Sequence, residues 1–141
     1  MMTPNAIKLR NVSVVRDGKH ILKHVDLELG YGENAVILGA NGSGKTTLVK
    51  LLTGDYRPYY EEDGSASISL FGETSWNIFE LRDRIGVVSM DLQSRFNSDT
   101  TVTEVITSGY FGSMDVFRNH EVTPEMVKAV YNAAVRMGID D

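Results

Sequence analysis

The chain contains no cysteine among its 141 residues. This absence excludes disulfide scaffolds, thiol nucleophiles and cysteine-based zinc sites. No apolar run approaches the roughly 18 residues that a membrane-spanning helix requires. The N-terminus, MMTPNAIKLR, also lacks the basic and then apolar order of a secretory signal. We therefore expect a soluble, cytoplasmic protein.

Positive charge is also scarce. Lys and Arg together number 14 against 19 Asp and Glu, which gives a formal net charge of -5. No basic run stands out, so a nucleic-acid partner is disfavoured. Hydrophobic residues make up 42% and charged residues 23%, close to the average for globular proteins, and the length leaves room for one domain.

The chain opens with the pattern of an antiparallel β-hairpin. Residues 6–15 alternate apolar and polar, but the parity slips near Arg10 and Asn11, as a β-bulge would produce. Asp17-Gly18 is a strong two-residue turn signal, and alternation resumes over 24–29.

Alternating strands and helices follow the hairpin. The compact apolar runs 35–38 and 85–88 indicate strands buried on both faces. A third strand with one apolar face is expected at 65–70 and ends at Gly72. Helices are expected over 44–53 and over 75–84, the second with Thr74 or Ser75 as its cap. A further helix is expected to begin at the capping box Thr101/Glu104. The last helix is expected to run from Thr123-Pro124 to Gly138, with one apolar face made by Val127, Val130, Tyr131, Ala134 and Met137. The pattern is that of an α/β protein.

The strongest chemical signal is a phosphate-binding loop. It matches G-x-x-x-x-G-K-[ST] and consists of Gly39, Ala40, Asn41, Gly42, Ser43, Gly44, Lys45 and Thr46, followed by Thr47. Its glycines let backbone N–H groups approach phosphate oxygens, and the helix that begins there adds its positive dipole end. Lys45 would lie between the β- and γ-phosphates, and the Thr46 hydroxyl would bind Mg²⁺. The alternative, a glycine-rich turn with an incidental lysine, does not explain why the match lies between a strand and an amphipathic helix.

The sequence around this loop resembles the nucleotide-binding domain of ATP-binding cassette (ABC) proteins. The resemblance is carried by the run LRNVSVVRDGKHILKHVDLELGYGENAVILGANGSGKTTLVKLLTG and continues through LFGE, LRDRIGVVSMDLQSRF and TVTEVITSGYFGS. It is most similar to the molybdate-transport and iron-complex branches. The resemblance implies a truncated phosphate-loop NTPase fold, with an α/β core over 1–98 and the beginning of a helical subdomain over 99–141.

Two positions depart from the pattern of the resembled family. Family members carry an aromatic residue that stacks on adenine at the end of the first strand, where this chain has Arg16. A planar guanidinium can stack on a base through a cation–π contact, and the alternative is a solvated turn residue. The family glutamine that touches Mg²⁺ and the attacking water falls in register on Met90. Either Gln93 takes that catalytic and metal-binding role or the contact is lost, because a thioether is a poor ligand for a hard cation.

The remaining catalytic motifs of the family have no counterpart in these residues. The signature sequence, the second acidic strand with Asp-Glu and the switch histidine all belong beyond the equivalent of residue 141, so we expect no turnover by this chain alone. Asp91 after the apolar run 85–88 superficially resembles the magnesium-bridging carboxylate of another phosphate-loop class, but it has no catalytic partner.

Three functions fit this resemblance. The first is the N-terminal part of an ABC transporter subunit that binds ATP and Mg²⁺. Such a subunit would pair with a second ATP-binding subunit or with the missing half. It would lie against a membrane transporter subunit at the inner face of the membrane. The second is a soluble ABC-type ATPase without a membrane partner. The third is a non-catalytic nucleotide-binding fragment. For such a fragment, an unpaired strand at 34–38 would lower stability.

Overall fold

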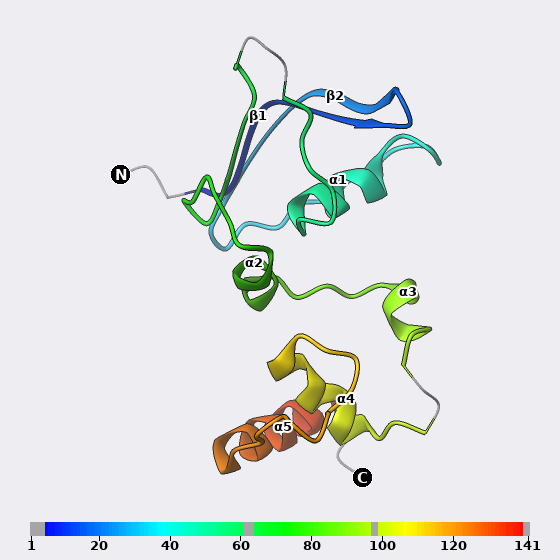
Figure 1. Cartoon of the computed structure of the whole chain (residues 1–141), viewed down its shortest axis with the longest axis vertical. Helices are drawn as coiled ribbons and strands as arrows, with labels where there is room; N and C mark the ends of the chain where they lie inside the picture. The colour runs from blue at the N-terminus through cyan, green and yellow to red at the C-terminus, as the bar shows by residue number, and fades with distance from the viewer. Residues whose placement is uncertain (1–4, 61–63, 97–98, 140–141) are drawn as a thin grey trace. The chain divides into compact units, whose positions relative to one another are not determined.

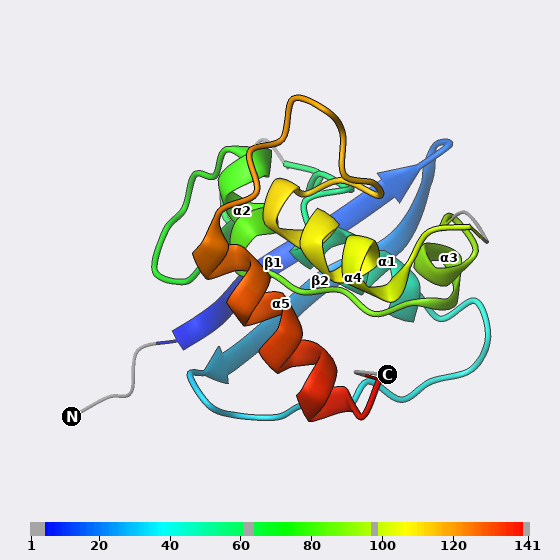
Figure 2. The same cartoon turned by 90° about the horizontal axis from the view of Figure 1, so that it is seen from below.

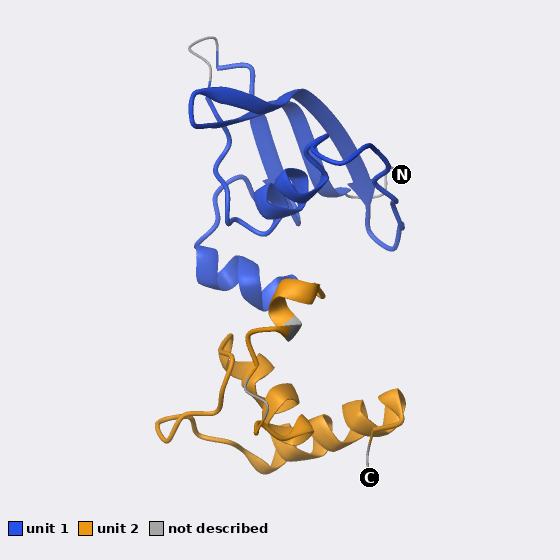
Figure 3. Cartoon of the chain, turned by 90° about the vertical axis from the view of Figure 1, so that its right-hand side faces the viewer, with its two compact units in different colours: residues 1–85 blue, residues 86–141 orange. Residues whose placement is uncertain are grey.

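The computed structural model of the chain describes residues 5–60, 64–96 and 99–139. They form two compact units, residues 1–85 and residues 86–141 (Figure 3). Each unit is described by itself below. The predicted division into a core over 1–98 and a helical subdomain over 99–141 remains a prediction.

The first unit is built on a three-stranded antiparallel sheet in the order β2-β1-β3 (Figure 1). β1 (Asn5–Arg16) and β2 (Lys19–Gly30) form the predicted hairpin, and β3 (Ser67–Leu70) pairs with the other edge of β1. Asp17 and Gly18 both have positive φ, 51° and 71°. Two such residues in a two-residue loop form a type I′ turn, whose twist matches that of the strands it joins.

The irregularity predicted near Arg10 and Asn11 is confirmed. The register of the hairpin shifts between Leu9 and Val12, and Asn11 has a φ of 50°. The bulge is held by polar contacts, because the Asn11 N–H donates to Asp26 Oδ1 at 3.0 Å and Asn11 Oδ1 lies 2.7 Å from His24 Nδ1. The displaced residue therefore keeps hydrogen-bond partners outside the regular ladder.

The core of this unit lies between the hairpin and α1 (Lys45–Leu52), in agreement with the helix expected over 44–53. Figure 2 shows β1 and β2 side by side along their length. The buried cluster consists of Leu9, Val12, Val14, Leu22 and Leu51, with Ile7, Val25, Leu27, Leu48, Leu52, Tyr56 and Ile68 packed around it. Burial of this apolar surface is the main stabilising term of the unit.

The helix expected over 75–84 begins later than predicted. α2 spans Ile78–Arg84 and is capped by Asn77, whose side chain accepts a hydrogen bond from the Phe79 N–H at 3.0 Å. Thr74 and Ser75 are therefore not the cap. An asparagine in extended conformation directly before the helix serves the same purpose as the predicted threonine or serine.

The two strands predicted to be buried on both faces are not found as strands. Residues 35–38 and 85–88 have no strand assignment, and Val36, Leu38 and Val88 are 82%, 87% and 101% exposed. A buried parallel strand needs a hydrogen-bonded neighbour on each side. In the described part of the chain no other segment is paired with either run.

The second unit is helical. It contains α3 (Met90–Gln93), α4 (Val102–Ser108), the 3₁₀ turn η1 (Gly109–Phe111) and α5 (Pro124–Met137). The predicted capping box at the start of α4 is confirmed, because the Thr101 hydroxyl accepts from the Glu104 N–H and the Glu104 carboxylate accepts from the Thr101 N–H. These bonds to the Thr101 backbone and hydroxyl lower the pKa of Glu104 below its ordinary value.

α5 begins and ends as predicted, with Thr123 as the N-cap and Gly138 in the left-handed conformation after it. Only part of its predicted apolar face is buried. Val130 and Ala134 are buried, whereas Val127, Tyr131 and Met137 are more than half exposed. None of the helices in the described residues has the length and apolar character that crossing a bilayer requires.

Candidate functional site

The phosphate-binding loop connects residues 35–38 to α1 and has the left-handed backbone that its glycines predict. Gly42 and Gly44 have φ values of 82° and 93°, which non-glycine residues rarely adopt. The loop is closed by the Ser43 N–H donating to Ala40 O at 3.2 Å, and α1 begins with the Leu48 N–H donating to Gly44 O at 2.9 Å. No side chain caps α1, so its first N–H groups have no capping partner at the end of the loop.

Gly44 fixes the loop against the hairpin. A Cβ at this position would lie 2.7 Å from Leu22 Cδ2 and 3.1 Å from the Ile21 carbonyl oxygen, so only glycine allows this approach. At Gly39 a Cβ would lie 2.5 Å from Ser43 Oγ, a contact that rotation of the serine side chain would relieve, so the packing constraint is weaker there. The glycines of the motif therefore provide close packing as well as backbone freedom.

Lys45 folds back over the loop. Its Nζ donates to the carbonyl oxygens of Gly39 and Ala40, both at 2.7 Å. These contacts hold the ammonium group above the centre of the loop, where a phosphate bound by the backbone N–H groups would meet it.

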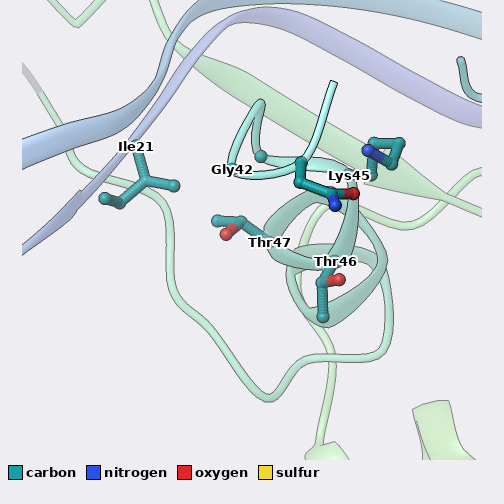
Figure 4. Close-up of a pocket in the computed structure, with 7 residues that line it drawn as sticks. Ile21, Gly42, Lys45, Thr46 and Thr47 are labelled. Carbon is teal, nitrogen blue, oxygen red and sulfur yellow. The ribbon is translucent and has the colours of Figure 1, made fainter. Parts of the chain in front are cut away.

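A pocket of about 290 Å³ opens over the start of α1. It is lined by Ile21, Asn41, Gly42, Gly44, Lys45, Thr46 and Thr47. Figure 4 shows Ile21 on β2 facing Thr47, while Thr46 leaves the helix in another direction. The Thr46 hydroxyl is the kind of oxygen donor that Mg²⁺ prefers, so the pocket fits a magnesium-bound phosphate. No group of three or more metal-ligating His, Cys, Asp or Glu side chains occurs in the described residues.

Ile21 is the lining residue that the sequence did not single out. It is 38% exposed although it is a large aliphatic residue on a strand. The signal in the sequence was its position only three residues after Gly18, at the end of the hairpin that approaches the loop. Its apolar surface gives the pocket one wall suited to the non-phosphate part of a ligand.

Arg16 is not among the residues that line the pocket. Its guanidinium carbon lies 4.6 Å from the centre of the Tyr56 ring, and Lys50 Nζ lies 5.3 Å from the same ring. Arg16 is exposed, as in the alternative of a solvated turn residue, but it has a defined partner within the chain. Whether it also stacks on a base remains a prediction.

The candidates for the magnesium and water contact lie in the second unit. Met90 is 81% exposed and begins α3, which is capped by the Ser89 hydroxyl at 3.1 Å from the Leu92 nitrogen. Asp91 is exposed on the first turn. The side chain of Gln93 lies outside the described residues, so its predicted catalytic and metal-binding role remains a prediction.

Comparison with known proteins assigns the family. The family described as ABC transporter matches residues 22–141. The chain belongs to this family. The fold expectation of the sequence is thereby confirmed, and the phosphate loop is that of an ABC ATP-binding component.

Individual relatives agree with this assignment. The ABC transporter ATP-binding protein ModF of Escherichia coli strain K12 is 36% identical over 140 residues, which are 95% of this chain and 27% of ModF. The hemin import ATP-binding protein HmuV of Vibrio cholerae is 35% identical over 106 residues, 74% of this chain and 38% of HmuV.

A solved ABC protein has a similar fold. CbiO1 of Clostridium perfringens, described as part of the ABC transporter complex cbiONQ, superimposes with a TM-score of 0.75 at 26% identity. The match covers 96% of this chain and 51% of CbiO1. The chain thus spans about a quarter to a half of the ABC proteins compared above.

Proposed function

We propose that the chain binds ATP with Mg²⁺ as the N-terminal part of an ABC transporter ATP-binding subunit, which couples ATP hydrolysis to transport. The observation that carries the proposal is the seating of Gly44 against Leu22 and Ile21, which places the loop, the first turn of α1 and the hairpin around one pocket.

Each residue of the motif has a role in this proposal. Backbone N–H groups over 39–47 bind the phosphate oxygens, and Lys45 neutralises charge between the β- and γ-phosphates. The Thr46 hydroxyl is a ligand of Mg²⁺, which supplies charge compensation for the triphosphate. The exposed apolar surface of Ile21 faces the nucleoside part of the ligand.

Hydrolysis and transport require more than this chain in our proposal. The family places its signature sequence, Asp-Glu carboxylates and switch histidine in segments that these 141 residues do not contain. We therefore propose a second ATP-binding subunit or a further half as one partner and a membrane transporter subunit as the other, at the inner face of the membrane. The names of relatives with similar identity specify hemin and zinc uptake, so no cargo is assigned.

The experiment measures ATP binding and phosphate release together. Calorimetry with Mg²⁺ compares the purified wild-type chain with Lys45→Ala and with Lys23→Ala, which removes an exposed lysine from β2 as a matched control. Loss of one charge-assisted contact to phosphate is expected to weaken binding roughly tenfold to a hundredfold in Lys45→Ala. Lys23→Ala is expected to bind like wild type, and none of the three chains is expected to release phosphate.

Other results would contradict the proposal in identifiable ways. Equal affinity in the wild type and Lys45→Ala would remove the phosphate loop from the binding site. Phosphate release that depends on Lys45 would show a complete ATPase and would favour the soluble-enzyme alternative, with Asp91 and Gln93 as the next residues to change.

A further inference from the structure

Asn41-Gly42 forms the first bend of the phosphate-binding loop. The Ser43 N–H donates to the Ala40 carbonyl oxygen at 3.2 Å, and Gly42 has a φ of 82°. A four-residue turn in which the third residue alone has a positive φ is of type II, so Asn41 and Gly42 take its two central positions. Asn41 is exposed and lines the pocket over the start of α1. Its side-chain amide is therefore open to water and borders the pocket.

The surroundings of this pair leave the side chain of Asn41 and the backbone nitrogen of Gly42 available for reaction. Within the part of the chain that the structure describes, neither group makes a hydrogen bond. A Cβ on Gly42 would meet nothing within 4 Å, so no neighbouring atom covers this glycine. Glycine also lacks the side chain that hinders approach to its own nitrogen. The Gly42 nitrogen can thus approach the side-chain carbon Cγ of Asn41 with little resistance.

Asn41 is the single asparagine of the chain that precedes a glycine. The sequence contains eight asparagines, and the other seven precede alanine, valine, isoleucine, serine or histidine. Asn119 is exposed like Asn41 but is followed by His120, whose side chain crowds the backbone nitrogen. The chain therefore contains its own comparison for the reactivity of Asn41.

We propose that Asn41 deamidates when no nucleotide is bound, and that the modification then weakens nucleotide binding. The Gly42 nitrogen attacks Asn41 Cγ, so that an N–Cγ bond forms, the Cγ–Nδ2 bond breaks and ammonia leaves with the proton of the Gly42 nitrogen. The product is a five-membered succinimide ring. Water then opens the ring at one of its two carbonyl carbons and gives aspartate or isoaspartate, each with one new carboxylate. No oxidant or reductant takes part.

Both products interfere with the binding of phosphate. A carboxylate at position 41 brings like charge to the triphosphate pocket. It also competes with phosphate for Lys45, whose Nζ lies 2.7 Å from the carbonyl oxygen of the adjacent Ala40. Isoaspartate adds one carbon to the main chain as well, which displaces the N–H groups of the loop. This consequence rests on the proposed function, whereas the reaction at Asn41 requires no nucleotide.

A bound nucleotide is expected to slow the reaction. Under the proposed function, backbone N–H groups over 39–47 donate to phosphate oxygens. A Gly42 nitrogen held in this way has less freedom to turn toward Asn41 Cγ. The chain is therefore most susceptible to deamidation while it waits for ATP.

The first measurement follows the modification itself. The purified chain is incubated at mildly alkaline pH with Mg²⁺, with and without ATP, and peptide mass spectrometry gives the converted fractions of Asn41 and Asn119. Without ATP, Asn41 is expected to convert roughly tenfold faster than Asn119 or more, because glycine leaves the attacking nitrogen unobstructed. ATP is expected to slow the conversion in the wild type but not in Lys45→Ala, which has lost its affinity for the nucleotide.

The second measurement determines what the modification does to binding. Calorimetry with Mg²⁺ and ATP compares the fresh chain with the deamidated fraction isolated by ion exchange, with Asn41→Asp and with Asn119→Asp. The deamidated chain and Asn41→Asp are expected to bind ATP about tenfold more weakly or worse. Asn119→Asp adds the same charge in the second unit and is expected to bind like the fresh chain. Thermal melts by circular dichroism confirm that each chain is folded, and the deamidated fraction alone decides if Asn41→Asp does not fold.

The inference and the proposed function fail differently. Equal conversion of Asn41 and Asn119 would overturn the inference while ATP binding stands. The same holds for a deamidated chain that binds ATP like the fresh chain, and for conversion that ATP does not slow in a chain that binds it. A fresh wild-type chain that binds no ATP would overturn the proposed function, and the link between Asn41 and nucleotide binding with it.

Discussion

Two apolar stretches of the first unit have opposite surroundings. In β1, Leu9, Val12 and Val14 are between 0% and 1% exposed. In residues 35–38, Val36 and Leu38 are 82% and 87% exposed. Residues 35–38 are all apolar, whereas only half of the residues of β1 are, so hydrophobicity alone does not decide which stretch is buried.

The difference lies in how far along the chain each stretch finds its neighbours. β1 is joined to β2 by the two-residue turn Asp17-Gly18, and α1 covers the core face of the pair. Residues 35–38 have the composition of a central parallel strand. The chain must make a long crossover connection before it can add a parallel neighbour to such a strand. A local hairpin supplies its own partner, whereas a central strand depends on distant segments.

The largest effect on the free energy of unfolding is expected from a substitution in the buried stretch, β1. Leu9→Ala removes a fully buried side chain from the core cluster. We expect it to lower the free energy of unfolding by about 2–5 kcal/mol, because the loss of buried apolar surface and the cavity left behind both destabilise the folded state. Urea unfolding measures this value, and a loss below 1 kcal/mol would mean that the hairpin core repacks around the deletion.

An intermediate effect is expected where the loop meets the hairpin. Gly44→Ala adds a Cβ within 2.7 Å of Leu22 Cδ2 to a residue with a φ of 93°. The left-handed backbone alone costs about 1–2 kcal/mol for a non-glycine residue. We expect lower stability and weaker ATP binding together, measured by urea unfolding and calorimetry. Gly86→Ala is the control, since Gly86 lacks a positive φ and its Cβ would meet nothing within 4 Å.

The smallest effect on the free energy of unfolding is expected from a substitution in the exposed stretch, residues 35–38. Leu38→Ser changes a side chain that is 87% exposed, so the free energy of unfolding is expected to shift by less than about 0.5 kcal/mol. Self-association in sedimentation velocity is expected to decrease, because an exposed apolar surface is removed. A loss as large as that of Leu9→Ala would show that residues 35–38 are buried in solution.

The features that the sequence predicted correctly are those encoded within a few residues. The Asp17-Gly18 turn, the bulge at Asn11 and the capping box of Thr101 and Glu104 are all confirmed. Each depends on side chains and backbone conformations of adjacent residues or of the neighbouring strand. The positive φ values of Gly42 and Gly44 belong to this class, whereas phosphate binding by the loop stays a prediction.

The features that were missed depend on contacts between distant residues. Ile21 lines the pocket only because Gly44 packs on β2, and Arg16 meets Tyr56 across 40 positions of sequence. The exposed Val127 and Tyr131 on α5 illustrate the same limit, because their apolar character did not reveal whether a neighbour covers them. Periodicity identifies an apolar face but not its partner.

Trp76 is the single tryptophan of the chain and lies in the first unit. Its indole N–H donates to the Leu70 carbonyl oxygen at 3.0 Å, its ring meets Phe71 edge to face, and Arg84 lies 5.1 Å over it. Tryptophan fluorescence therefore reports on the contact between β3 and the end of α2. Far-ultraviolet circular dichroism receives signal from the helices of both units. Melting curves followed by the two signals would coincide for a cooperative chain and diverge if the units unfold separately.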